Sequence, residues 1–393
     1  MGNQARRRIG VALRVTAALA SAATLAVTGY GWWLQQSLTD GLTTTAAVTR
    51  SVESDDVDTT GEEFTALLVG LDSRTDANGE PLPVEVLARL RAGVDEGQLN
   101  TDTIILLHVP AGPQSRAVAI SFPRDAYVPI AGGHGTHKIN SAYRRGAAQT
   151  RDRLTAAGLK GPAVEQAARE AGRRTLIATV EALTGVPIDH YAEINLAGFV
   201  ELTEAIGGVP VCLRNPVREP RSGIDLPAGP QLVRGPDALA FVRQRHGLPD
   251  GDLDRVIRQH AFLAGVARKV LSAGTLTDPV RASRLISAVT RHVVVDQGWD
   301  LQRIAQRLGQ LSAADLEFHT IPTGRPDLAT PADGVAVEVD LGAVRDFVQR
   351  TLGRADVTAA PTTTPSSIWP FAAETPTTPE PEPFTAGSLT CVD

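Results

Sequence analysis

The chain has 393 residues, 42% of them hydrophobic and 21% charged, which is enough apolar material for one large domain or two ordinary ones. Its 38 basic and 44 acidic side chains give a net charge of −6. This balance argues against a general nucleic-acid-binding protein, since such domains are usually basic. The two cysteines, Cys212 and Cys391, are too few for a disulfide-rich scaffold or a structural zinc site.

The N-terminus predicts a membrane anchor. An arginine cluster at residues 6–8 precedes an uncharged stretch over residues 15–34. At about 1.5 Å per residue, a helix of this length just spans a hydrocarbon core of about 30 Å. The arginines favour a cytoplasmic N-terminus, so we expect the rest of the chain outside the membrane. A cleaved signal peptide is the alternative, because Ala18-Leu19-Ala20 resembles a cleavage site, but the apolar stretch continues well beyond it.

A location outside the membrane favours a disulfide between the two cysteines. In an oxidising compartment Cys212 and Cys391 most simply pair with each other, and two free thiols are the alternative. Cys391 lies near the end of a Pro/Thr-rich tail, residues 354–393, whose composition cannot bury a core of its own. A disulfide would tie this tail to the folded body.

Between residues 63 and 353, segments predicted to be strands alternate with segments predicted to be helices. Apolar runs predict strands at 64–69, 103–109, 117–121, 191–194, 209–213 and 316–321. Helices are predicted within 144–172 and at 175–183, 196–206, 252–272, 281–290 and 300–311, and residues 75–98 are predicted to be an inserted loop. This alternation is typical of a layered α/β fold. The expected segments are a cytoplasmic stub (1–14), a transmembrane helix (15–34), an extracytoplasmic spacer (35–62), one large α/β domain (63–353) and the tail (354–393).

Familiar catalytic motifs are absent from the sequence. It contains no G-x-S-x-G, no Walker A motif, no H-E-x-x-H and no G-x-G-x-x-G that opens a helix. His134 and His137 have H-x-x-H spacing, but they lie among glycines without a third ligand nearby, so we do not expect a metal site there.

Carboxylates and an arginine gather at strand ends instead. Asp72 follows the first strand and Asp102 immediately precedes the second. Because the second and third strands look like a hairpin, Asp102 is expected close to Arg124, and Asp72 joins them if the first strand runs parallel to the third. Two carboxylates suit a hard ion such as Mg²⁺, and the planar fork of arginine matches phosphate oxygens.

The second half of the sequence adds further arginines. If residues 239–245 are extended, Arg243 and Arg245 point the same way and can share one ligand. A helix that opens at Asp252 presents a polar face. The residues on that face are Arg255, Arg258 and Gln259. Singly, each arginine is more often a solvated ion-pair partner, but arginines in a first helical turn are unfavourable unless an anion lies there. We therefore predict a local anion site.

Taken in order, these motifs resemble the LytR-CpsA-Psr family over about residues 64–272. The matching segments are Val69-Gly-Leu-Asp72-Ser-Arg74, Asn100-Thr-Asp102-Thr, Ile120-Ser-Phe-Pro-Arg124-Asp125, Lys138-Ile-Asn140-Ser-Ala-Tyr143, Val242-Arg243-Gln-Arg245 and Asp252…Arg255…Arg258-Gln259. Any one motif is weak, but six in order at plausible spacings are specific. The single anchor also matches, and the closing Cys391-Val392-Asp393 resembles actinobacterial members.

The resemblance implies a layered α-β-α fold with a central mixed sheet, behind one transmembrane helix. It implies an enzyme on the outer face of the cell membrane that takes a glycopolymer from a polyprenyl-pyrophosphate carrier. The glycopolymer is then attached to peptidoglycan through a phosphodiester. Nucleic acid is not an expected partner.

The resemblance also implies roles for residues. Asp72 and Asp102 match ligands of Mg²⁺ (or Mn²⁺), and Arg124 matches the principal catalytic arginine. The positions that match pyrophosphate-binding residues are Arg243, Arg245 and Gln259, and those similar in place with less defined roles are Arg74, Lys138, Arg255 and Arg258. Asp125, or a metal-held carboxylate, is the candidate base. One departure is Asn100, where family members often have an arginine, and it puts one phosphate contact in doubt.

Two other readings remain at this point. A pyrophosphate hydrolase would use the same site, because water is just another acceptor. A non-catalytic wall-binding or regulatory module would explain the anchor and spacer but not the convergence of carboxylates with an arginine. The apolar helical stretches 176–183, 199–206 and 262–271 are candidates for a lipid slot or ordinary core helices.

Overall fold

The computed structural model describes twelve parts of the chain. They are residues 42–48, 63–76, 79–91, 99–112, 116–220, 222–244, 246–248, 252–271, 279–300, 307, 310–353 and 384–393. The chain divides into two units, residues 1–42 and 43–393, and all elements described below belong to the second. The predicted anchor at 15–34, Arg245, most of the predicted helix at 300–311 and most of the tail lie outside the described residues. Within the ranges given, no helix has both the length and the apolarity needed to cross a bilayer.

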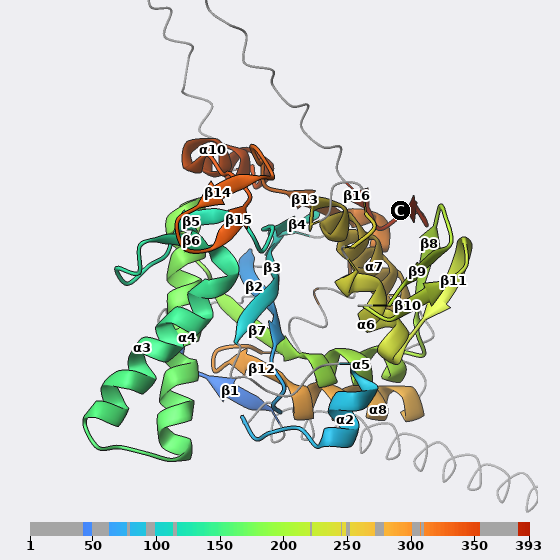
Figure 1. Ribbon diagram of the computed structural model, residues 1–393. Helices are drawn as coiled ribbons and strands as arrows, with labels where there is room; N and C mark the ends of the chain where they lie inside the picture. Colours follow the sequence, from blue (N-terminus) through green and yellow to red (C-terminus); the bar gives the residue numbers. More distant parts are fainter. Residues whose placement is uncertain are drawn as a thin grey trace, which may run out of the picture. The chain divides into compact units, whose positions relative to one another are not determined.

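An eight-stranded mixed sheet forms the centre of the second unit (Figure 1). In spatial order its strands are β1 (Thr43–Thr45), β12 (Val293–Asp296), β7 (His190–Asn195), β2 (Phe64–Asp72), β3 (Asn100–Val109), β4 (Ala117–Ser121), β13 (Leu316–Thr320) and β16 (Phe384–Thr385). β2 pairs antiparallel with β3 and β3 antiparallel with β4, so β2 and β4 run in the same direction. The predicted hairpin and the shared edge at the ends of β2 and β4 are therefore confirmed.

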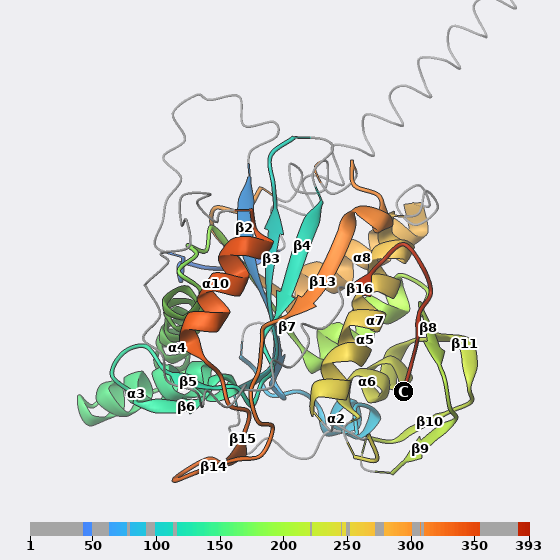
Figure 2. The same ribbon diagram turned by 90° about the horizontal axis from the view of Figure 1, so that it is seen from above.

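Helices cover both faces of this sheet (Figure 2). The helices of the described residues are α2 (Val84–Arg89), α3 (Ala142–Ala156), α4 (Pro162–Thr184), α5 (Leu196–Ala205), α6 (Gly235–Arg243), α7 (Asp252–Leu271), α8 (Pro279–His292) and α10 (Leu341–Thr351). Leu67, Ile104 and Ile120 pack against α3, α4 and α10, whereas Ile105 and Ala119 face α7. Because both faces are covered, the central strands are nearly continuous apolar runs. The layered α/β prediction and its central mixed sheet are confirmed.

A smaller sheet lies against α7 and contains the end of the described chain. Its strands are β11 (Gly229–Val233), β8 (Val209–Leu213) and β17 (Cys391–Val392). Cys212 of β8 and Cys391 of β17 form a disulfide, which confirms the predicted pairing. Three two-stranded ribbons complete the unit: β5 (Tyr127–Pro129) with β6 (Thr136–Lys138), β9 (Val217–Glu219) with β10 (Ile224–Leu226), and β14 (Leu328–Thr330) with β15 (Gly334–Ala336).

The folded unit extends past both ends of the predicted domain. β1, formed by three β-branched threonines of the predicted spacer, pairs with β12 at one edge of the central sheet. β16, which follows the Pro/Thr-rich segment, pairs with β13 at the other edge. Short edge strands such as these give little sequence signal, because only one side of each is paired.

Two local predictions were wrong. Residues 239–243 are not extended but belong to α6, which begins with Gly235 at φ 58° and Pro236 in its first turn. Five consecutive residues, 238–242, are buried there, so the run of apolar side chains that suggested a strand is a buried helix. The second error concerns two strand ends. Asp102 lies inside β3 rather than before it, because the strand begins at Asn100, and Asp72 is the last residue of β2 rather than the residue after it.

A histidine between α7 and the sheet should make stability depend on pH. Burial of the imidazole, aided by nearby His319, lowers the pKa of His260 to about 3, and its Nε2 lies 2.8 Å from Ser121 Oγ. An unfolded histidine has a pKa of about 6.5, so between these values unfolding takes up a proton. Stability should fall as pH falls through this window, by about 1.4 kcal/mol per pH unit for this group.

The change that tests this is His260→Gln, which keeps a polar partner for Ser121. Urea denaturation between pH 6.5 and pH 4 should show a pH dependence of the unfolding free energy that is flatter by about one proton. His246→Gln, at an exposed position, is the control and should keep the wild-type slope. Equal slopes in all three proteins would contradict the assignment.

Candidate functional site

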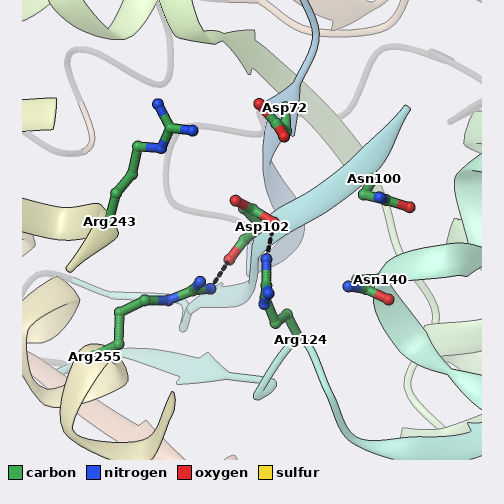
Figure 3. A pocket seen from close by; sticks show the side chains of 7 residues that line it. All are labelled: Asp72, Asn100, Asp102, Arg124, Asn140, Arg243 and Arg255. Carbon is green, nitrogen blue, oxygen red and sulfur yellow. Dashed lines mark hydrogen bonds and ion pairs between the residues drawn. The ribbon is translucent and has the colours of Figure 1, made fainter. Parts of the chain in front are cut away.

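A polar pocket of about 310 Å³ opens at the sheet edge where β2 ends and β3 begins (Figure 3). The residues that line it are Asp72, Asn100, Asp102, Arg124, Asn140, Arg243 and Arg255. Five of these were predicted site residues, and they come from five separate segments of the sequence. The fold therefore brings together the predicted carboxylates, the predicted catalytic arginine and two of the predicted anion-binding arginines.

The irregular pairing of β2 with β3 places Asp102. Gly70 pairs with Thr103 and Leu71 with Thr101, so Asp102 has no Cα partner in β2 and occupies a β-bulge. Bulges turn a side chain out of the regular alternation and are common beside active sites. Gly70 permits the tight local packing, since a Cβ atom there would lie 3.1 Å from the Thr103 Cβ atom. The bulge therefore sets the direction in which the Asp102 carboxylate points.

Arg124 is held from both sides by carboxylates. Its Nη1 donates to Asp102 Oδ1 at 2.7 Å, and its Nε lies 3.7 Å from Asp125 Oδ2. Lys138 Nζ in turn lies 3.2 Å from Asp125 Oδ1. Opposite charges thus alternate from Asp102 to Lys138. Asp125 does not line the pocket, and its carboxylate faces two cations, which is an arrangement that orients Arg124.

The predicted polar face of α7 divides between two environments. Arg255 is 3% exposed and donates from Nη2 to the main-chain oxygen of Asp102 at 2.7 Å. Gln259 lines an adjoining apolar pocket. Arg258, 1% exposed, lies against β17 instead and donates to the main-chain oxygen of Asp393 and to Gln244. One helical turn therefore serves both the pocket and the attachment of the C-terminal segment.

The two carboxylates of the pocket differ in their electrostatics. Burial, and then the charge of Asp102, raises the pKa of Asp72, although Arg74 lies 3.4 Å away and Arg243 also opposes the shift. Burial also acts to raise the pKa of Asp102, but Arg124, Arg255 and Arg243 outweigh it and lower that pKa. Asp102 is therefore the firmly ionised carboxylate, and Asp72 is the one that further positive charge would stabilise most.

The donor set fits a hard divalent ion. Asp72 and Asp102 both supply carboxylate oxygens to the pocket (Figure 3). In the described part of the chain, no three residues among His, Cys, Asp and Glu group together as a metal cluster. An ion held here by two carboxylates would fill its shell with water or substrate oxygens, as Mg²⁺ commonly does.

An apolar pocket adjoins the polar one. Its apolar walls come mainly from Ile194, Leu196, Phe199, Leu239 and Val242, and it shares Asp72, Asp102, Arg243 and Arg255 with the polar pocket. Of the three helical stretches considered for a lipid slot, only 199–206 contributes to this lining. Leu176 and Leu183 belong to the core beneath α4, and Phe262 packs behind Phe199 with ring centroids 5.2 Å apart.

Sequence reasoning missed a buried network that fixes the loop after Asp72. Arg169 donates from Nη2 to Thr75 Oγ1 at 2.9 Å, and Ser73 Oγ lies 2.6 Å from the same hydroxyl. Asn195 Nδ2 donates to the main-chain oxygen of Thr75 at 2.8 Å. These groups come from three distant segments, so no local spacing could have revealed them. Together they hold the backbone that carries Asp72 and Arg74.

The chain belongs to the LytR-CpsA-Psr family, because the LytR_cpsA_psr family model matches residues 33–339. It is 47% identical over 291 residues to the cell wall biosynthesis protein LcpA of Corynebacterium glutamicum, covering 74% of this chain and 56% of that protein. It is 30% identical over 232 residues to the polyisoprenyl-teichoic acid–peptidoglycan teichoic acid transferase TagU of Bacillus anthracis, covering 58% and 65%. The chain therefore spans about half to two thirds of the length of these relatives. The family predicted from the motifs is confirmed.

Solved structures show the same fold. TagV of Bacillus subtilis superposes with a TM-score of 0.54 at 20% identity, covering 75% of this chain and 99% of that one. TagT bound to LI-WTA gives 0.51 at 22% identity, covering 79% and 99%. Identities this low support a shared architecture, and roles for individual residues rest on the pocket itself.

Proposed function

We propose that the protein is a membrane-anchored phosphotransferase that moves a glycopolymer from a polyprenyl-pyrophosphate carrier onto peptidoglycan through a phosphodiester. The observation that carries this proposal is the adjacency of the two pockets. One holds two carboxylates and three arginines, and the other is largely apolar and shares two of those arginines. A lipid pyrophosphate carries a charged pyrophosphate directly attached to an apolar chain, so a single molecule would match both pockets. The name of the related TagU protein describes a transfer of this class.

Arginines would bind and stabilise the pyrophosphate. Arg243 and Arg255 border both pockets, so they are placed to hold phosphates whose lipid lies in the apolar pocket. Arg124, fixed by Asp102, would stabilise the negative charge that builds up during transfer. Arg245, Arg74, Lys138 and Gln259 are proposed in supporting roles. Lys138 would act through Asp125, and Gln259 would lie where the isoprenoid meets the phosphate.

Asp72 and Asp102 would hold Mg²⁺ (or Mn²⁺). When bound, the ion would supply positive charge to the phosphate oxygens. In the transfer, a sugar hydroxyl of peptidoglycan forms a bond to the phosphorus that bears the glycopolymer, and the bond to the oxygen of polyprenyl phosphate breaks. The hydroxyl proton would go to a carboxylate of the pocket, and Asp72, which lines the pocket, is the candidate best placed to accept it. Asp125, engaged by Lys138 and outside the lining, is less well placed.

The setting of this reaction follows from the predicted anchor. A helix over residues 15–34 with its arginine cluster inside would hold the catalytic unit on the outer surface of the cell membrane. Polyprenyl carriers reside in that membrane, so the anchor would keep the enzyme near its donor.

The test uses the full-length chain in lipid nanodiscs with a polyprenyl-pyrophosphate glycan, Mg²⁺ and peptidoglycan. We expect a covalent glycan–peptidoglycan adduct together with free polyprenyl phosphate. EDTA should abolish both products, and added Mg²⁺ should restore them. Free phosphorylated glycan as the sole product would identify a hydrolase and overturn the transferase, and activity that is unchanged in EDTA would overturn the metal assignment.

A further inference from the structure

The polar pocket has two chemically different sides (Figure 3). Arg243 and Arg255, from α6 and α7, lie on one side, and Asn100 of β3 and Asn140 lie on the other. The Asp102–Arg124 ion pair lies between the two sides. The pocket therefore changes from cationic to neutral and polar across its width.

Only the cationic side is shared with the apolar pocket. Arg243 and Arg255 line both pockets, whereas neither Asn100 nor Asn140 lines the apolar one. A ligand with its lipid in the apolar pocket and its phosphates at the arginines would therefore face Asn100 and Asn140 across the polar pocket. Whatever is attached beyond the pyrophosphate, or approaches it from the far side, meets the two carboxamides.

The side chains of Asn100 and Asn140 make no hydrogen bond to any residue that the structure describes. The backbone of Asn140 is nevertheless fixed. Its N–H donates to the main-chain oxygen of Arg124 at 3.1 Å, and its own oxygen accepts from Thr101 Oγ1 at 3.4 Å. A carboxamide offers two donors and one acceptor oxygen, so both side chains retain their full hydrogen-bonding capacity toward the pocket.

We propose that Asn100 and Asn140 form a subsite for sugar hydroxyls next to the pyrophosphate. Neutral groups that both donate and accept match hydroxyls, which also do both, better than they match phosphate oxygens, which only accept. This inference rests on the proposed function and adds the part of the substrate that the carboxamides recognise. The hydroxyls belong either to the first sugar of the donor or to the acceptor sugar of peptidoglycan.

The experiment compares wild type, Asn100→Ala and Asn140→Ala in the full-length chain. The control is Asn215→Ala, an exposed asparagine outside both pockets whose carboxamide bonds to Asp393. Affinity is measured for polyprenyl pyrophosphate and for the same lipid carrying one N-acetylglucosamine. Michaelis constants for peptidoglycan are measured in the transfer assay. Thermal unfolding of each variant verifies the fold.

A subsite for the donor sugar predicts a fivefold to tenfold loss of affinity for the glycosylated lipid alone, with the bare lipid unaffected. A subsite for the acceptor predicts equal lipid affinities and a comparable rise in the Michaelis constant for peptidoglycan. Variants that match wild type in the ratio of lipid affinities and in that Michaelis constant would overturn the subsite alone. A wild-type chain that binds neither lipid would overturn the proposed function and the subsite together.

Discussion

Arg124→Ala is expected to lower the rate of glycopolymer transfer at least about a thousandfold, as loss of a charge-stabilising arginine does in other phosphoryl transfers. Arg124 lines the polar pocket and its guanidinium is fixed by Asp102 at 2.7 Å. The substitution would remove a positioned cation. It would also raise the pKa of Asp102, because Arg124 is the strongest influence that lowers it. Both effects reduce the charge complementarity of the pocket, so turnover should fall far more than lipid binding.

Two further variants sharpen this measurement. Arg124→Lys keeps the charge but not the planar fork, so its rate should lie between those of wild type and the alanine variant. Arg325→Ala removes an exposed arginine that pairs with Glu338 away from the pocket and should leave transfer unchanged. Circular dichroism establishes that each variant is folded. Turnover by folded Arg124→Ala within tenfold of wild type would refute the assigned role.

Removing the disulfide is expected to cost about 5 kcal/mol of unfolding free energy. Cys212 and Cys391 are 179 residues apart in sequence, and a long closed loop restricts the unfolded chain strongly. The bond also retains β17, whose neighbour Asp393 accepts a hydrogen bond from the buried guanidinium of Arg258. Burial lowers the pKa of Arg258 to about 10, opposed by the charges of Asp393 and Asp254. Loss of the segment would leave that cation with less compensation.

The measurement is guanidinium denaturation of the Cys212→Ser/Cys391→Ser double variant beside wild type in oxidising and reducing buffer. The reduced wild type should match the double variant. The oxidised wild type should be more stable by the amount given above. If the double variant, the reduced wild type and the oxidised wild type agreed in unfolding free energy within about 1 kcal/mol, constraint of the unfolded chain by the disulfide would not be a source of stability.

The sequence predicts the residues at the sheet edge of the polar pocket well, because they lie on strands that are close together in the sequence. Strands β3 and β4 follow one another closely in the sequence, and such strands commonly pair antiparallel, which brings Asp102 and Arg124 to the same sheet edge. Asp72 follows from the same geometry, since β2 lies next to β3 with its last residue opposite Asn100. Motif order then assigned these positions to a family that the family model confirms.

What sequence reasoning could not supply depends on contacts between distant segments. The bulge at Asp102 is a property of two paired strands and is invisible in either strand alone. The run of α6 up to Arg243 has the same apolar residues as a strand, and only its packing against α5 and α7 decides between the two. Arg258 contacts the C-terminal segment whereas Arg255 lines the polar pocket, and this difference likewise depends on where β17 lies.

The hydrogen bond from Arg255 to the main-chain oxygen of Asp102 separates two properties of the polar pocket. Every amino acid at position 102 offers the same carbonyl, so this hydrogen bond of Arg255 does not depend on the identity of the side chain there. Substitutions at 102 can alter the negative charge of the pocket while the neighbouring guanidinium keeps this hydrogen bond. In the proposed mechanism, the affinity for the ion and the affinity for the phosphate could therefore be changed separately, both in natural variation and by protein engineering.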